Sequence, residues 1–75
     1  MLSLPREREH ARLWESLKTL SEEHQEILNL RHFQDLSYAE IAELLEIAEG
    51  TVMSRLFRAR RALAAAMRKS QKEKR

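Results

Sequence analysis

The spacing of apolar residues in the last third of the chain constrains its fold most strongly. Apolar side chains recur at intervals of four, three, four and four residues in the series Val52, Leu56, Ala59, Leu63 and Met67. At about 100° per residue, this spacing places all of them on one face of an α-helix. We therefore predict a helix over residues 49–69 that packs against a core along that face.

The near absence of turn-forming residues predicts that the rest of the chain is helical too. A β-rich fold needs many turn residues, but the 75 residues include one glycine and one proline. Strong helix formers such as alanine, leucine, glutamate and arginine dominate instead. We expect an all-α fold, a small four-helix domain. Its helices should cover residues 1–19, 21–33, 37–46 and 49–69, followed by a frayed basic tail at 70–75.

Capping signals indicate where the helices begin and end. Ser21 is suited to cap the second helix, whose first turn is acidic. Ser37 and Glu40 have the spacing of a capping box, the sharpest start signal in the chain. Asp35 tolerates the left-handed conformation and can end the second helix in place of a glycine. The turn at residues 47–49 is very short, which is typical of a helix-turn-helix.

The apolar positions of the first three helices complete the expected core. The inward residues should be His10, Leu13, Trp14, Leu17, Ile27, Leu28, Leu30, Phe33, Ile41, Leu44 and Leu45. A domain of this size has few places to hide a tryptophan. The stripe around Trp14 could therefore serve a protein partner rather than only the core.

Charge is divided unevenly along the chain. Residues 1–50 hold five Lys/Arg and eleven Asp/Glu, a net charge of −6, whereas residues 51–75 hold nine and one, a net charge of +8. The basic part is a candidate surface for a polyanion. The acidic part would repel DNA and is free to meet a protein partner.

Several classes of function are disfavoured. The chain has no cysteine, which excludes a disulfide framework and a thiolate metal site. No apolar run approaches the roughly 20 residues that span a membrane, so we expect a soluble, cytoplasmic protein without membrane insertion. His24 and His32 are too far apart for a simple metal-binding pair on a helix, and no phosphate loop or activated nucleophile is evident. No enzyme activity, metal or cofactor is expected.

The side of the fourth helix opposite Val52 and Leu56 indicates contact with DNA. It holds Ser54, Phe57, Arg58 and Arg61, with Thr51 and Arg55 on one shoulder and Met53 and Arg60 on the other. Arginine can donate two hydrogen bonds to guanine, a ring can contact thymine methyls, and a hydroxyl suits any base edge. The shoulder arginines and Thr51 are better placed for phosphates. Gly50 lets the backbone approach a phosphate at the positive helix N-terminus.

Two blander interpretations of this basic helix compete with DNA binding. Arginine-rich faces are often only solubilising, and basic amphipathic helices can lie on membranes. A solvated face has no need of Phe57, although the ring could pack on the third helix or the tail. The apolar face lacks the Trp or Phe of a membrane-surface helix. The capped third helix, the short turn and the outward ring together favour the major groove of DNA.

These segments resemble a known family. LSYAEIAELL at residues 36–45, GTV at 50–52 and SRLFRAR at 54–60 resemble region four of bacterial sigma factors, most closely the extracytoplasmic-function group. LSEEHQEIL at 20–28 and LRHF at 30–33 resemble the earlier helices of that region. The resemblance implies a helix-turn-helix domain of the winged-helix-like superfamily, without a wing. It also implies binding to the −35 element of promoter DNA within RNA polymerase holoenzyme, contact with the β flap, and frequent sequestration by an anti-sigma factor.

The resemblance also implies roles for single residues. Together with the position of these residues opposite the core side of the fourth helix, the resemblance implies that the base-reading residues are Ser54, Phe57, Arg58, Arg55 and Arg61. The residues expected near the DNA backbone are Ser37, Tyr38, Gly50, Thr51, Met53 and Arg60. The chain departs from the family pattern at Glu46, where glycine is common, at Ala48, where proline is frequent, and at Met53, where lysine or arginine is usual. Met53 removes a charge from phosphate range and places a flexible apolar side chain near the groove.

The sequence leaves open functions other than promoter binding. The domain that melts promoters is absent from these residues, which indicates an excised domain or a small stand-alone relative. The chain could be a protein-interaction module that binds an anti-sigma factor or the β flap. It could also be an independent dimeric helix-turn-helix regulator that needs two half-sites about one helical turn apart.

Overall fold

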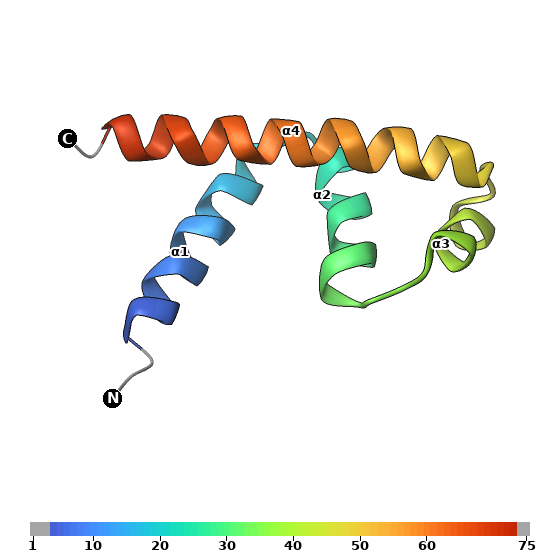
Figure 1. Ribbon diagram of the computed structural model, residues 1–75, viewed down its shortest axis with the longest axis horizontal. Helices are drawn as coiled ribbons and strands as arrows, with labels where there is room; N and C mark the ends of the chain where they lie inside the picture. Colours follow the sequence, from blue (N-terminus) through green and yellow to red (C-terminus); the bar gives the residue numbers. More distant parts are fainter. Residues whose placement is uncertain (1–3, 74–75) are drawn as a thin grey trace.

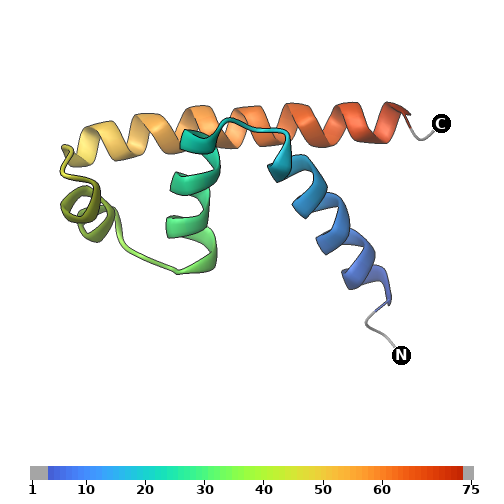
Figure 2. The same cartoon turned by 180° about the vertical axis from the view of Figure 1, so that it is seen from behind.

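The computed structural model describes the backbone of residues 4–73 and the side chains of residues 11–69. Within residues 4–73, four α-helices and one short π-helical turn are joined by short connections. In chain order the elements are α1 (Leu4–Lys18), α2 (Glu22–Leu28), η1 (Asn29–Phe33), α3 (Tyr38–Leu45) and α4 (Glu49–Glu73). The other helices all lie along one side of α4, as the opposite views in Figures 1 and 2 show. No strand occurs within residues 4–73, and the predicted all-α class is confirmed.

The predicted helix starts are formed by the predicted side chains. The Ser21 hydroxyl accepts a hydrogen bond from the His24 backbone N–H at 3.2 Å. At the start of α3 the Glu40 N–H donates to the Ser37 hydroxyl at 3.0 Å, and the Ser37 N–H donates to Glu40 Oε1 at 2.7 Å. This reciprocal capping box satisfies two backbone donors that a helix N-terminus leaves free.

The second helix widens in its last turn. The Gln34 N–H donates to the Asn29 carbonyl at 3.0 Å, a step of five residues that defines the π-helical turn η1. Asp35 follows with φ of 59°, which confirms the expected left-handed conformation at the helix end. The wider turn moves later side chains around the helix axis. This shift explains why Phe33, expected to face inward, is exposed whereas Leu30 is buried.

The turn between α3 and α4 also uses a left-handed residue. Glu46 ends α3 with φ of 59° and ψ of 47°, at the position where the family pattern favours glycine. The Ile47 N–H then donates to the Ala42 carbonyl at 3.0 Å, and α4 begins at Glu49. A glutamate pays a steric cost in this conformation that glycine avoids. Three residues, 46–48, thus connect the two helices of a helix-turn-helix.

The helix α4 continues past its expected end at Lys69 to Glu73. Residues 70–73, which we expected in a frayed tail, are helical, because neither glycine nor proline stops the helix there. Residues 74–75 of that tail lie outside the described part of the chain.

Side chains from all four α-helices and η1 meet in one core. The most buried apolar residues are Leu17, Ile27, Leu28, Leu30, Ile41, Val52, Leu56 and Ala59, all at predicted inward positions. The side chain of His10 lies outside the described residues.

Two further core predictions are wrong. Trp14 and Leu44 are 52% and 59% exposed. Because α3 packs on α4 and η1 from one side, it buries one stripe through Ile41, and Leu44 falls beside that stripe. Trp14 instead stacks on Phe33 at the molecular surface.

Candidate nucleic-acid interface

The helix α4 presents one face that no other described helix covers. Its buried residues Val52, Leu56 and Ala59 point into the core that α1, α2 and α3 form on one side of it. At 3.6 residues per turn, the opposite side faces solvent along the whole helix-turn-helix. Figures 1 and 2 show this side of α4 uncovered from both directions.

The uncovered side of α4 gathers four of the five residues expected to read bases, together with Met53, which was expected near the DNA backbone. One open depression there is lined by Met53, Ser54, Phe57, Arg58 and Arg61, all exposed, and we call this set the outward face. The guanidinium carbon of Arg61 lies 5.6 Å from the centre of the Phe57 ring, a cation–π contact one helical turn away. Among the described side chains, no carboxylate lies within ion-pair distance of Arg58 or Arg61. Their charges are therefore available to a ligand.

Arg55 lies to the side of the outward face and has a partner within the domain. Its Nε is 3.1 Å from Glu23 Oε2 on α2, and its side chain is about one-third exposed. With Thr51, Gly50 and Arg58 it lines a second, neighbouring depression. A half-exposed ion pair of this kind is weak and can open. The structure brings Arg55 close to the other predicted base readers but engages its charge with α2.

The residues predicted near the DNA backbone occupy varied settings. Thr51 and Gly50 are exposed in the first turn of α4, and a methyl group added at Gly50 would meet no atom within 4 Å. The Ser37 hydroxyl already accepts the capping hydrogen bond. Tyr38 is half-buried against the core, with the Arg31 guanidinium 5.4 Å from its ring centre. The open N-terminus of α4 is thus the most accessible of these positions.

Arg60 contacts His32, a residue for which the sequence predicted no role in the interface. Its Nε donates to His32 Nε2 at 3.3 Å, which requires that this ring nitrogen carry no proton. Burial lowers the pKa of His32, and the nearby charges of Arg60 and Arg31 lower it further. The lowered pKa favours the neutral ring, which can accept this hydrogen bond from Arg60 on the shoulder of the outward face.

Arg31 is a second residue whose role the sequence did not indicate. Its Nη1 donates to the Leu36 carbonyl at 3.2 Å and lies 3.6 Å from Asp35 Oδ1. Its guanidinium also covers the Tyr38 ring. These contacts tie the loop after η1 to the first residue of α3. Arg31 is thus a positioning residue for the start of the helix-turn-helix.

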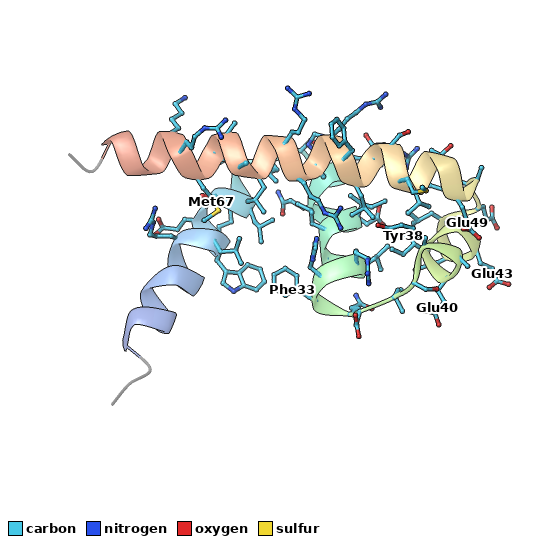
Figure 3. All side chains as sticks on the ribbon, viewed as in Figure 1. Phe33, Tyr38, Glu40, Glu43, Glu49 and Met67 are labelled. Carbon is cyan, nitrogen blue, oxygen red and sulfur yellow. The ribbon has the colours of Figure 1, made fainter. Side chains whose placement is uncertain are left out.

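An aromatic groove forms a second surface on the other side of the domain. The Trp14 and Phe33 rings stack with centres 5.2 Å apart and planes 17° apart. Figure 3 shows Phe33 pointing from the end of η1 towards α1, below α4. The groove beside them is lined by Trp14, Leu17, Lys18, Glu22, Gln25, Glu26, Asn29 and Phe33, and we call it the Trp14–Phe33 groove.

Two negative findings apply to the described residues. None of the helices in residues 4–73 is long and apolar enough to cross a bilayer. Within the same part of the chain, no three His, Cys, Asp or Glu side chains are grouped as metal ligands would be.

Known sequences with similar patterns include several sigma factors. RNA polymerase sigma factor YlaC of Bacillus subtilis is 46% identical over 63 residues, 84% of this chain and 36% of that protein. RNA polymerase sigma-H factor of Pseudomonas aeruginosa is 42% identical over 53 residues, 71% of this chain and 28% of that protein. ECF RNA polymerase sigma-E factor of Haemophilus influenzae is 40% identical over 48 residues, 64% of this chain and 25% of that protein. The chain therefore spans about a quarter to a third of the length of these curated relatives.

A family model assigns the domain itself. The model described as "Sigma-70, region 4" matches residues 10–63, most of the chain. The matched range contains α2, η1, α3 and the whole outward face. With its helix-turn-helix and its sigma-factor relatives, one of them named as an ECF sigma factor, the chain belongs to the sigma-70 region 4 family.

Proposed function

We propose that the outward face of α4 reads the −35 element of promoter DNA in the major groove during transcription initiation. The observation that carries this proposal is the uncovered face itself, where Arg58 and Arg61 have no acidic partner among the described side chains. The major groove is about 12 Å wide and accepts a helix of this kind. The relatives named as RNA polymerase sigma factors support the same role.

Each part of the interface has a task in this proposal. Arg58 and Arg61 donate hydrogen bonds to guanine edges, and Ser54 donates or accepts at a neighbouring base. Gly50 and Thr51 approach a phosphate at the N-terminus of α4, where the partial positive charge of the helix favours an anion. Ser37 and Tyr38, at the start of α3, lie along the adjacent DNA backbone, where Arg31 contacts the Leu36 carbonyl and the Tyr38 ring. Arg60 contacts phosphate from the shoulder beside His32.

Salt-dependent binding tests this function. Duplexes enriched from a random library by the chain are compared with scrambled duplexes of equal composition, with Kd measured from about 50 to 200 mM salt. We expect a steep loss of affinity with salt on both duplexes, because phosphate contacts release counterions, and tighter binding to the enriched duplex at every salt concentration. A flat salt dependence without sequence preference would contradict DNA reading and favour an interaction module.

A second function is favoured by the Trp14–Phe33 groove. We propose that it binds RNA polymerase through the β flap, and that an anti-sigma factor competes for it. Trp14 is half exposed and stacked on a second ring, which is unusual for a residue that only fills a core. Phe33, which lines the groove, lies below α4 in Figure 3, and the groove shares no lining residue with the outward face, so DNA and a protein partner can be bound together.

The variant Trp14→Ala tests the groove. Loss of a central aromatic anchor typically costs about 2 kcal/mol, so we expect roughly 30-fold weaker binding to RNA polymerase. Binding to the enriched duplex should not change. The matched control is Leu44→Ala, which removes a comparably exposed apolar side chain on α3. Equal binding of polymerase by Trp14→Ala and wild type, or an equal loss with Leu44→Ala, would exclude the groove as the partner site.

A further inference from the structure

The outward face carries two large apolar side chains that the fold leaves in solvent. Met53 is 50% exposed and Phe57 is 60% exposed. They are four residues apart on α4, a spacing that brings side chains together on a helix surface. Neither belongs to the core cluster or to the half-buried residues packed against it. Folding therefore does not explain why an otherwise polar, arginine-bearing face keeps them.

The two side chains share one site with the residues that bind polar groups. Met53 and Phe57 line the same open depression as Ser54, Arg58 and Arg61. The Arg61 guanidinium lies 5.6 Å from the Phe57 ring centre, a cation–π contact on this face. Methionine is unbranched and polarisable, so Met53 can close against a small apolar group beside the ring. The site is thus an apolar patch bordered by hydrogen-bond donors.

One group in the major groove matches an apolar patch of this kind. Among the edges of the four bases, thymine alone presents a methyl group there, at C5, whereas the other edges present donors and acceptors. We propose that Met53 and Phe57 together bind the C5-methyl group of a thymine and so make A·T pairing a requirement at that position. The inference rests on the proposed function, because it needs α4 in the major groove. It adds Met53 as a residue that determines sequence preference.

Replacing thymine with deoxyuridine removes this methyl group and leaves base pairing unchanged. In the enriched duplex, each thymine is replaced in turn and Kd is measured with the 75-residue chain. We expect about fourfold weaker binding at one thymine, the effect of one buried methyl-sized group. With Met53→Ala most of this difference between thymine and deoxyuridine should disappear. Thermal unfolding of each variant checks that the fold is intact.

A second variant separates the methyl contact from charge. Met53→Lys places an ammonium group where the methionine lies. It should abolish the discrimination between thymine and deoxyuridine. It should also increase the slope of log Kd against log salt by the amount that about one additional phosphate contact contributes. Loss of discrimination together with the steeper salt dependence supports the proposal. Retained discrimination in Met53→Lys overturns it.

The outcomes distinguish this inference from the proposed function. If no duplex is enriched over random DNA, the promoter-reading function fails and the inference fails with it. If a duplex is enriched but no thymine in it responds to deoxyuridine, or none is required, DNA reading stands and the methyl site is overturned. If discrimination survives in Met53→Ala but not in Phe57→Ala, the ring alone binds the methyl and the role of Met53 is wrong.

Discussion

Replacing Arg58 with alanine is expected to cost roughly 1–3 kcal/mol of binding free energy on the enriched duplex and much less on a scrambled one. Arg58 lies on the outward face without an acidic partner among the described side chains, so its guanidinium can reach a guanine edge. Binding isotherms on both duplexes measure the two losses.

The control for Arg58 is another exposed arginine of the same helix. Arg68 lies on α4 beyond the residues that line the outward face. Arg68→Ala should weaken both duplexes equally or not at all, because a phosphate contact does not depend on sequence. If Arg58→Ala also lowered both affinities equally, Arg58 would be a phosphate contact and the assignment of base reading would move to other residues of the face.

Replacing Leu56 with alanine should have the largest effect on folding. Leu56 is 1% exposed and belongs to the core cluster that the described side chains form. Buried leucine-to-alanine substitutions cost about 2–5 kcal/mol, a large share of the roughly 5–15 kcal/mol that stabilises a typical domain. Denaturant or thermal unfolding followed by circular dichroism measures the loss.

The neighbouring residue provides the matched comparison for Leu56. Phe57 is a larger apolar side chain on the same helix, but it points to solvent. We expect Phe57→Ala to leave the free energy of unfolding almost unchanged while weakening binding to the enriched duplex. A large destabilisation by Phe57→Ala would show that the ring packs against the protein and would contradict its place on the outward face.

Local chemistry explains what could be predicted from the sequence. The capping box of Ser37 and Glu40 involves residues three apart, so its geometry follows from the helix that it starts. Asp35 can adopt its left-handed conformation because its side chain is short and polar and can form local hydrogen bonds. The division of α4 into a buried and an open face follows from periodicity alone. Most residues of the outward face could therefore be identified from the sequence.

The remaining features depend on how distant segments meet. Arg60 and His32 are 28 positions apart, and the ion pair of Arg55 with Glu23 likewise joins two helices. No spacing rule reveals such pairs. The surroundings of Trp14 depend on its stack with Phe33 at the end of η1, a wider turn that the sequence did not predict. Whether a side chain at the margin of a small core is buried or exposed, as at Leu44, depends on how the helices pack against one another.

The strict separation of faces along α4 has a consequence for evolution. Adjacent residues such as Leu56 and Phe57 lie in different environments, because Leu56 is buried in the core and Phe57 lines the outward face. Substitutions on the exposed side have little effect on stability, so they need no compensating change elsewhere. Descendants of such a domain can therefore diverge in the DNA sequence that they prefer while inheriting the same scaffold.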